Sequence, residues 1–216
     1  KKGFLRQAMW AADERGMLGL HAGSKVVVAR DAQSNELKRH GVILFGMTAT
    51  GKSTWSCHQL EMDPKRGEMT YASQDDICFL KDDGSAYGSE HNFYLKTDLR
   101  KSDQEAMFHA LTHKSALLEN VMVDAQGNID FLDESLCGNG RAVVRMDKLA
   151  IERDGRMISI AAESINLPSL EKNDALWFAF ITRRNTIMPF SQMLTPEQGV
   201  LAYLFGESTL SFAANP

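Results

Sequence analysis

Cysteines, long apolar runs and an excess of positive charge are what this sequence has little of. Its 216 residues include three cysteines, Cys57, Cys78 and Cys137, and none of them lies in a CxxC spacing. An odd number without a paired spacing argues against a disulfide framework and favours free thiols in a reducing compartment, so we expect a cytoplasmic protein. The net charge of −4 comes without any block of lysine and arginine, which argues against nucleic acid as a partner.

The apolar residues are spread along the chain rather than gathered in one long run. They make up 44% of the sequence, against 24% charged residues, which is typical of a globular domain with a sizeable core. No run approaches the length of a membrane span, so we expect no membrane partner. The sequence starts at Lys1-Lys2-Gly3, with neither Met nor the apolar segment of a signal peptide. We therefore expect residues 1–216 to be part of a longer chain.

Most of the elements that the sequence predicts are short strands. Their apolar runs lie at 17–21, 26–29, 42–45, 68–73, 121–123, 129–131 and 175–181. Helices are expected at 4–16, 51–60 and 103–119 and from Thr195 onward. The periodicity of residues 147–174 predicts no element. We expect Trp10, Trp55 and Trp177 to pack in or near the core. Frequent strands with few long helices predict a mixed α/β core.

The most specific motif is the segment 46–54, which fits G-x-x-x-x-G-K-[ST] at every specified position. It follows the apolar run 42–45 and precedes a helix-compatible stretch, which is the context of a phosphate-binding loop. The backbone N–H groups of such a loop and the start of the next helix favour an anion. The predicted nucleotide contacts are therefore Thr48, Ala49, Thr50, Gly51, Lys52, Ser53 and Thr54. The alternative is a glycine-containing turn without a ligand.

An acidic pair, Asp75-Asp76, follows the predicted strand 68–73. Nucleoside triphosphatases place a metal-binding carboxylate at a strand end beside the phosphate loop. Alone, the pair is more typical of a solvated turn, and only the predicted loop favours a metal site.

Several segments resemble the ATP-dependent phosphoenolpyruvate carboxykinases. Segment 46–54 is similar to that family's kinase-1 loop, and Asp75-Asp76 to its kinase-2 element. The other similar segments are 1–3, 20–23, 63–66, 92–97, 116–121, 127–131 and 139–141. They occur in the family's order, with compatible spacings, over most of residues 1–146. The resemblance implies an α/β fold, a mixed-sheet P-loop nucleotide-binding core of the phosphoenolpyruvate carboxykinase type, for residues 1–216.

The resemblance also implies two metal ions. Lys2, His21 and Asp76 would hold Mn²⁺, and Asp75 would contact these ligands without binding the metal itself. Ser53 would hold the Mg²⁺ of the nucleotide complex. A lysine ligand must be neutral, and burial beside a divalent cation would lower its pKa. Without the resemblance, His21 reads as a core histidine and Lys2 as a frayed terminus.

The implied reaction is the decarboxylation of oxaloacetate to an enolate, which ATP then phosphorylates to phosphoenolpyruvate, releasing CO₂ and ADP. Mn²⁺ would act as a Lewis acid on the enolate oxygen. Lys52, Lys96 and Arg141 would neutralise charge on the moving phosphoryl group, with Thr48 near the metal. Lys52, Asp76 and Arg141 are therefore the predicted catalytic residues.

Some positions depart from the family. Thr48-Ala49 replaces Ser-Gly, Gln74 replaces a usual Gly, and Ile77-Cys78-Phe79 replaces a polar stretch. No counterpart is found for the family's N-terminal domain or for the segment that closes over adenine. Two alternatives therefore stay open: a small kinase or phosphorylase on the same fold, and a nucleotide-binding module without turnover. Nothing in the sequence indicates an oligomeric state.

Overall fold

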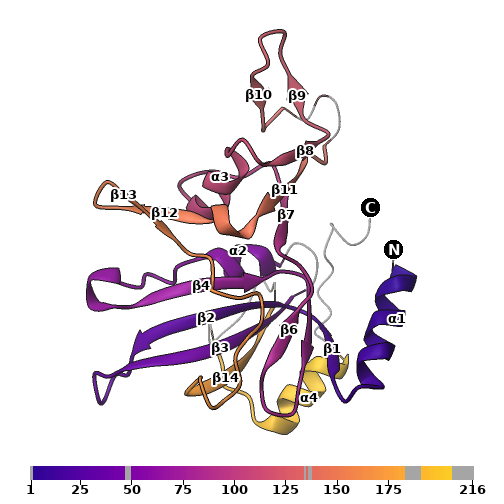
Figure 1. The fold of residues 1–216 in the computed structure, drawn as a ribbon, viewed down its shortest axis with the longest axis vertical. Helices are drawn as coiled ribbons and strands as arrows, with labels where there is room; N and C mark the ends of the chain where they lie inside the picture. Colours follow the sequence, from indigo (N-terminus) through magenta and orange to yellow (C-terminus); the bar gives the residue numbers. More distant parts are fainter. Residues whose placement is uncertain (1, 47–49, 134, 136–137, 183–190, 206–216) are drawn as a thin grey trace.

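A mixed four-stranded sheet forms the base of the molecule (Figure 1). The computed structural model describes residues 2–46, 50–133, 135, 138–182 and 191–205. The strand order is β14-β3-β2-β4, with β14 (Ala175–Ile181) parallel to β3 (Leu37–Gly46). On the other side of β3, β2 (Gly23–Arg30) is antiparallel to both β3 and β4 (Met69–Gln74). The predicted α/β class with a mixed sheet is confirmed.

The apolar run 42–45 lies in the middle of this sheet, as predicted. β3 is longer than that run because it pairs along its whole length with β2, from Gly23↔Leu44 to Arg30↔Leu37. Helix α2 (Lys52–Cys57) follows and contacts β2, β3 and β4. It is shorter than the predicted helix 51–60, because His58 is already extended.

A second sheet lies above the first and has the order β7-β11-β8. Its strands are β7 (Asn92–Lys96), β11 (Arg141–Arg145) and β8 (Leu117–Glu119). Helix α3 (Glu105–Leu111) packs against it. The predicted helix 103–119 is therefore wrong beyond residue 111. Leu117–Glu119 contains good helix formers, but pairing with β11 decides its conformation.

The remaining strands form three smaller antiparallel units. One joins β1 (Leu18–His21), β5 (Ile77–Leu80) and β6 (Ala86–Gly88), and another is the hairpin of β9 (Met122–Val123) and β10 (Ile129–Asp130). The third is a hairpin of β12 (Ala150–Arg153) and β13 (Arg156–Ser159), in the region where the sequence predicted no element. Its turn residues, Asp154 and Gly155, have φ of 51° and 71°. An Asp-Gly pair favours this hairpin turn.

The terminal helices lie at the surface. They are α1 (Lys2–Asp13) and α4 (Pro196–Phe205), and two short 3₁₀ turns occupy Pro64–Arg66 and Met146–Lys148. The predicted helix start at Thr195 is confirmed: its backbone N–H donates to Gln198 Oε1 and its Oγ1 accepts from the Gln198 N–H. Within the described ranges, no helix combines the length and the apolar character that crossing a membrane requires.

Two apolar clusters form the core. One lies between α3, the second sheet and β4, and includes Phe93, Leu95, Leu111 and Val144. The other joins the first sheet to the β1-β5-β6 unit through Leu20, Val26, Ile43 and Leu167.

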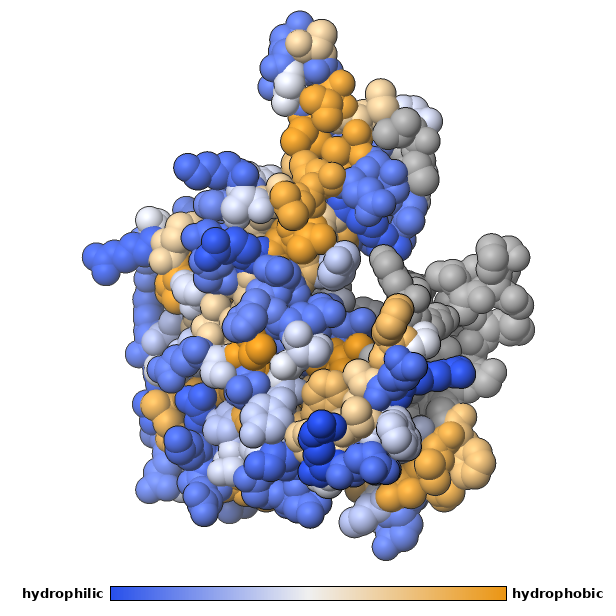
Figure 2. All heavy atoms as spheres, turned by 45° about the vertical axis from the view of Figure 1, so that its right-hand side comes forward, coloured by the Kyte–Doolittle hydropathy of each residue, from blue (hydrophilic) through white to orange (hydrophobic). Residues whose placement is uncertain are grey.

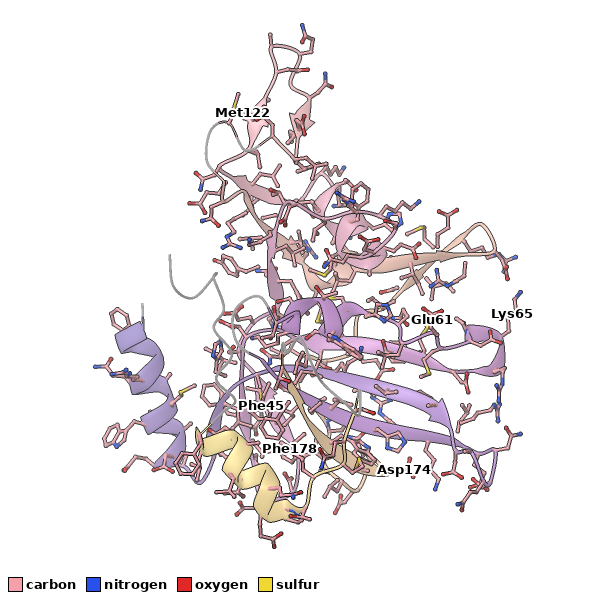
Figure 3. All side chains as sticks on the ribbon, turned by 180° about the vertical axis from the view of Figure 1, so that it is seen from behind. Phe45, Glu61, Lys65, Met122, Asp174 and Phe178 are labelled. Carbon is pink, nitrogen blue, oxygen red and sulfur yellow. The ribbon has the colours of Figure 1, made fainter. Side chains whose placement is uncertain are left out.

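The prediction that the tryptophans pack in the core is wrong. Trp10, Trp55 and Trp177 are 66%, 40% and 43% exposed. Trp177 lies on the edge strand β14, none of whose residues is fully buried, and its neighbour Phe178 stacks on Phe45 near α4, with ring centroids 6.2 Å apart (Figure 3). Further apolar side chains gather at the base of the β9–β10 hairpin (Figure 2), where Leu117 and Leu132 are exposed.

Candidate active site

Four charged or titratable side chains from distant parts of the chain meet at one end of the first sheet. His21 ends β1, Lys52 begins α2, and Asp75 and Asp76 lie between β4 and β5. The β1–β5 register places His21 opposite Ile77, which brings the imidazole to the neighbouring Asp76. We call His21, Lys52, Asp75 and Asp76 the charged cluster.

Two groups of the charged cluster converge on one oxygen. Asp76 Oδ1 lies 2.9 Å from His21 Nε2 and 2.9 Å from Lys52 Nζ. Lys52 Nζ also lies 3.5 Å from Asp75 Oδ1. The Ser53 hydroxyl donates to Asp75 Oδ2 over 2.5 Å. The structure therefore brings together His21, Lys52, Ser53 and Asp76, all of which the sequence predicted for the site.

The charged cluster has a buried side and an open side. The side chains of Lys52 and Asp75 are 10% and 7% exposed, whereas those of His21 and Asp76 are 58% and 51% exposed. Hydrogen bonds from His21 and then Lys52 hold the pKa of Asp76 well below its usual range, although burial acts in the opposite direction. Asp76 has a φ of 86°, a conformation that non-glycine residues rarely adopt. Such backbone strain clusters at functional sites.

A close approach of three elements supports the buried side. A Cβ on Gly23 would lie 2.5 Å from Ser56 Oγ and 3.2 Å from Asp75 Oδ1, so any larger residue at this point of β2 would have to displace these side chains. Gln74 donates from Nε2 to the backbone oxygen of Ala22 over 3.0 Å. The residue that departs from the family pattern at position 74 thus ties β4 to the turn between β1 and β2.

The predicted phosphate loop is described in part. Gly51 has a φ of 99°, which glycine adopts without strain, and a Cβ on Gly46 would collide with Thr50 Oγ1. Thr48 and Ala49 lie outside the described residues, as does the side chain of Lys2. Thr54 Oγ1 accepts a hydrogen bond from Gln104 Nε2 over 2.7 Å, which directs this hydroxyl toward the segment before α3.

Lys96 and Arg141 lie on the second sheet, where they are direct partners in the β7–β11 register. Leu95 and Ala142, their neighbours, are buried, so Lys96 and Arg141 share the opposite face of the sheet. No hydrogen bond or ion pair within the described ranges joins either residue to the charged cluster. The structure therefore makes these two predicted residues cross-strand partners of each other.

Sequence reasoning missed two further groups at this end of the molecule. Burial, followed by the charges of Asp76 and Asp75, raises the pKa of Glu90. Lys25 is fully buried beneath α2. Lys25 directly precedes the apolar run 26–29, but nothing in that pattern marks it as buried, because buried lysines are rare. Cys57 and Cys78 are buried free thiols, whose pKa values burial raises; Cys137 lies outside the described residues.

Comparison with known proteins agrees with these features. The profile of the family described as phosphoenolpyruvate carboxykinase matches residues 1–213. A phosphoenolpyruvate carboxykinase (ATP) from Aeropyrum pernix is 36% identical over 209 residues, which cover 96% of this chain and 39% of the relative. The chain thus spans about two fifths of the length of that relative. Because the family profile covers nearly every residue, this chain belongs to the phosphoenolpyruvate carboxykinase family.

Proposed function

We propose that residues 1–216 form the nucleotide- and metal-binding core of an ATP-dependent phosphoenolpyruvate carboxykinase. The reaction converts oxaloacetate and ATP to phosphoenolpyruvate, CO₂ and ADP, and we place it in the cytoplasm. The convergence of His21 Nε2 and Lys52 Nζ on Asp76 Oδ1 carries this proposal. This convergence brings a candidate phosphate-binding lysine together with two candidate metal ligands. A reaction between a metal-bound substrate and a nucleotide requires such an arrangement.

The residues present fit a divalent metal. Asp75 Oδ1 is buried and accepts no hydrogen bond from the described residues, and a second carboxylate and an imidazole lie beside it. This mixed nitrogen and oxygen set suits Mn²⁺ as well as Mg²⁺. His21 and Asp76 would hold Mn²⁺ together with Lys2, and Ser53 would hold the Mg²⁺ of the nucleotide. When bound, Mn²⁺ supplies Lewis-acid stabilisation of an enolate oxygen.

The chain's own residues would bind and orient the phosphates. Lys52 is nearly buried at the start of α2, so its ammonium would face the β- and γ-phosphates in a setting that water screens poorly. The Ser53 hydroxyl, held by Asp75 at 2.5 Å, is oriented for a metal or a phosphate oxygen. Gly51 in its left-handed conformation leaves the backbone free to approach the anion.

Lys96 and Arg141 would act from the second sheet. Lys96 lies beside Arg141 on one face, with Glu119 as the partner of Arg141 on its other side, and an arginine can hold a phosphoryl group through two parallel hydrogen bonds. Catalysis then requires the nucleotide to bridge the charged cluster and this pair. We propose that bound ATP draws the two sites together and excludes water, which would otherwise protonate the enolate to pyruvate.

Binding and turnover separate this proposal from the alternatives. Calorimetry should show that the protein binds Mg·ATP and that Lys52→Ala weakens this binding about tenfold or more. A coupled assay with Mn²⁺, ATP and oxaloacetate, scored separately for phosphoenolpyruvate and pyruvate, tests the reaction. Lys38→Ala, which changes a half-buried lysine on β3 that lies 3.8 Å from Asp31, is the matched control.

Each outcome has a distinct meaning. Phosphoenolpyruvate formation that is lost in Lys52→Ala supports the carboxykinase. Mg·ATP binding without any product from oxaloacetate, in a chain extended to the length of the relative, favours a nucleotide-binding module instead. Equal turnover of the parent and Lys52→Ala would remove the assigned phosphate site. We expect residues 1–216 alone to turn over oxaloacetate poorly. They span about two fifths of the length of the relative, and catalysis requires that both oxaloacetate and the nucleotide be held in place.

A further inference from the structure

Lys25 is a buried lysine that the proposed reaction does not use. It lies on β2, where the pairing with β4 shifts register between Ser24 and Lys25. Its residue exposure is 1%, and it is among the largest fully buried side chains in the described part of the protein. A buried ammonium costs free energy unless its N–H groups find acceptors.

The acceptors of Lys25 are both at the end of α2. Nζ donates to the backbone oxygen of Trp55 over 2.8 Å and to that of His58 over 2.7 Å. The last carbonyls of a helix have no partner within the helix, so Lys25 supplies a hydrogen-bond donor to two carbonyls at this end of α2. The His58 oxygen also accepts from Thr70 Oγ1, over 3.0 Å.

The apolar surroundings of Lys25 disfavour its charged form. Burial lowers the pKa of Lys25 to about 8, and the nearby Cys57 thiol acts weakly in the opposite direction. An apolar side chain of similar length would fill the same space without this desolvation cost. The ammonium is therefore suited to a specific task, which its two carbonyl partners identify as holding the end of α2.

Helix α2 depends on such support from outside. It has six residues, a length of about 9 Å, and a helix this short does not persist on its own. Its N-cap, Gly51, supplies no side-chain hydrogen bond. Its first two residues are Lys52 and Ser53, the proposed phosphate and metal contacts. Any tilt or fraying at its far end moves these side chains.

We propose that Lys25 is a positioning residue for the phosphate site. Its ammonium anchors the C-terminal end of α2 and so fixes where Lys52 and Ser53 meet the triphosphate. It touches neither the nucleotide nor the metal. This inference rests on the proposed nucleotide-binding function and adds a residue outside the predicted loop to it.

The test uses Mg·tripolyphosphate, which probes the phosphate site without the nucleoside. Lys25→Met removes the ammonium but keeps an unbranched chain, and Lys38→Met is the control on a half-buried lysine away from α2. Calorimetry well below each variant's unfolding temperature measures affinity in the folded state. We expect Lys25→Met to weaken binding roughly tenfold to a hundredfold and Lys38→Met to match the parent. Lys25→Gln, whose amide keeps two N–H donors, should lie between Lys25→Met and the parent.

The outcomes separate this inference from the proposed function. A folded Lys25→Met variant that binds tripolyphosphate like the parent overturns the role of Lys25 and leaves the phosphate site standing. Equal losses in Lys25→Met and Lys38→Met would show a general charge effect, which also overturns it. A parent that binds no tripolyphosphate overturns both. If Lys25→Met does not fold, Lys25→Gln decides: at least about threefold weaker binding supports the role, and parental affinity refutes it.

Discussion

Replacing Lys52 by Met should strengthen Mn²⁺ binding while weakening nucleotide binding. In the structure, Asp76 Oδ1 accepts hydrogen bonds from His21 Nε2 and from Lys52 Nζ, each over 2.9 Å. A metal ion bound to this oxygen must share it with the ammonium or displace it. Without nucleotide, Lys52 therefore competes with the metal; with nucleotide, the phosphates attract Lys52 and the competition is relieved.

The size of the effect follows from the distances. Two unit charges about 4 Å apart interact by about 4 kcal/mol at an effective dielectric constant of about 20. The side chain of Asp76 is 51% exposed, so solvent and salt screen much of this repulsion. We expect about 1–2 kcal/mol to remain, which corresponds to about 5- to 30-fold tighter Mn²⁺ binding in Lys52→Met.

Paramagnetic resonance of free Mn²⁺ measures this affinity directly. The parent, Lys52→Met and the control Lys38→Met are titrated without nucleotide and again with ATP. Without nucleotide, Lys52→Met should bind Mn²⁺ more tightly than the parent. With ATP this difference should shrink, and the control should match the parent under both conditions. Mn²⁺ affinity that is unchanged or lower in nucleotide-free Lys52→Met would refute the shared-oxygen argument.

Three further predictions concern the same site. His21→Ala and Asp76→Ala should each weaken Mn²⁺ binding about tenfold or more by paramagnetic resonance, and parental affinity in both would place the metal elsewhere. Because the pKa of Asp76 is depressed in the folded protein, the stability that it contributes is present above about pH 4 and is lost as the pH falls further. Asp76→Asn should therefore lose less stability than the parent when acid unfolding is followed by circular dichroism, and parallel curves would contradict this. Gly23→Ala places a methyl group 2.5 Å from Ser56 Oγ and should cost about 1–3 kcal/mol, or about 2–4 °C of Tm per kcal/mol in calorimetry, whereas Gly199→Ala, with no atom within 4 Å, should not lower Tm.

The sequence predicted the elements whose signal is local. The apolar runs within β3 and β14 are continuous, and clear breaks bound them: Gly41 and Gly46 for the first, Asp174 and Thr182 for the second. Where tertiary pairing decides, the prediction was wrong. Leu117–Glu119 forms a strand because β11 offers an edge, a fact that a window of helix formers does not contain. The hairpin at 150–159 was predictable in principle from Asp154-Gly155.

The site was predicted in the same uneven way. The motif and the resemblance named His21, Lys52, Ser53 and Asp76, and the structure places them within one network. Lys25 was missed because its partners are backbone carbonyls, which no side-chain pattern reveals. Such contacts follow from the packing of α2 on β2.

The pairing of Lys96 with Arg141 also limits how the length of the chain can vary. Their strands alternate between core and surface, so inserting or deleting one residue inside β7 or β11 would turn a charged side chain toward Phe93 and Leu95. The exposed loop between Val123 and Ile129 has no such constraint. Across natural relatives, gaps should accumulate in that loop and be absent from the two strands.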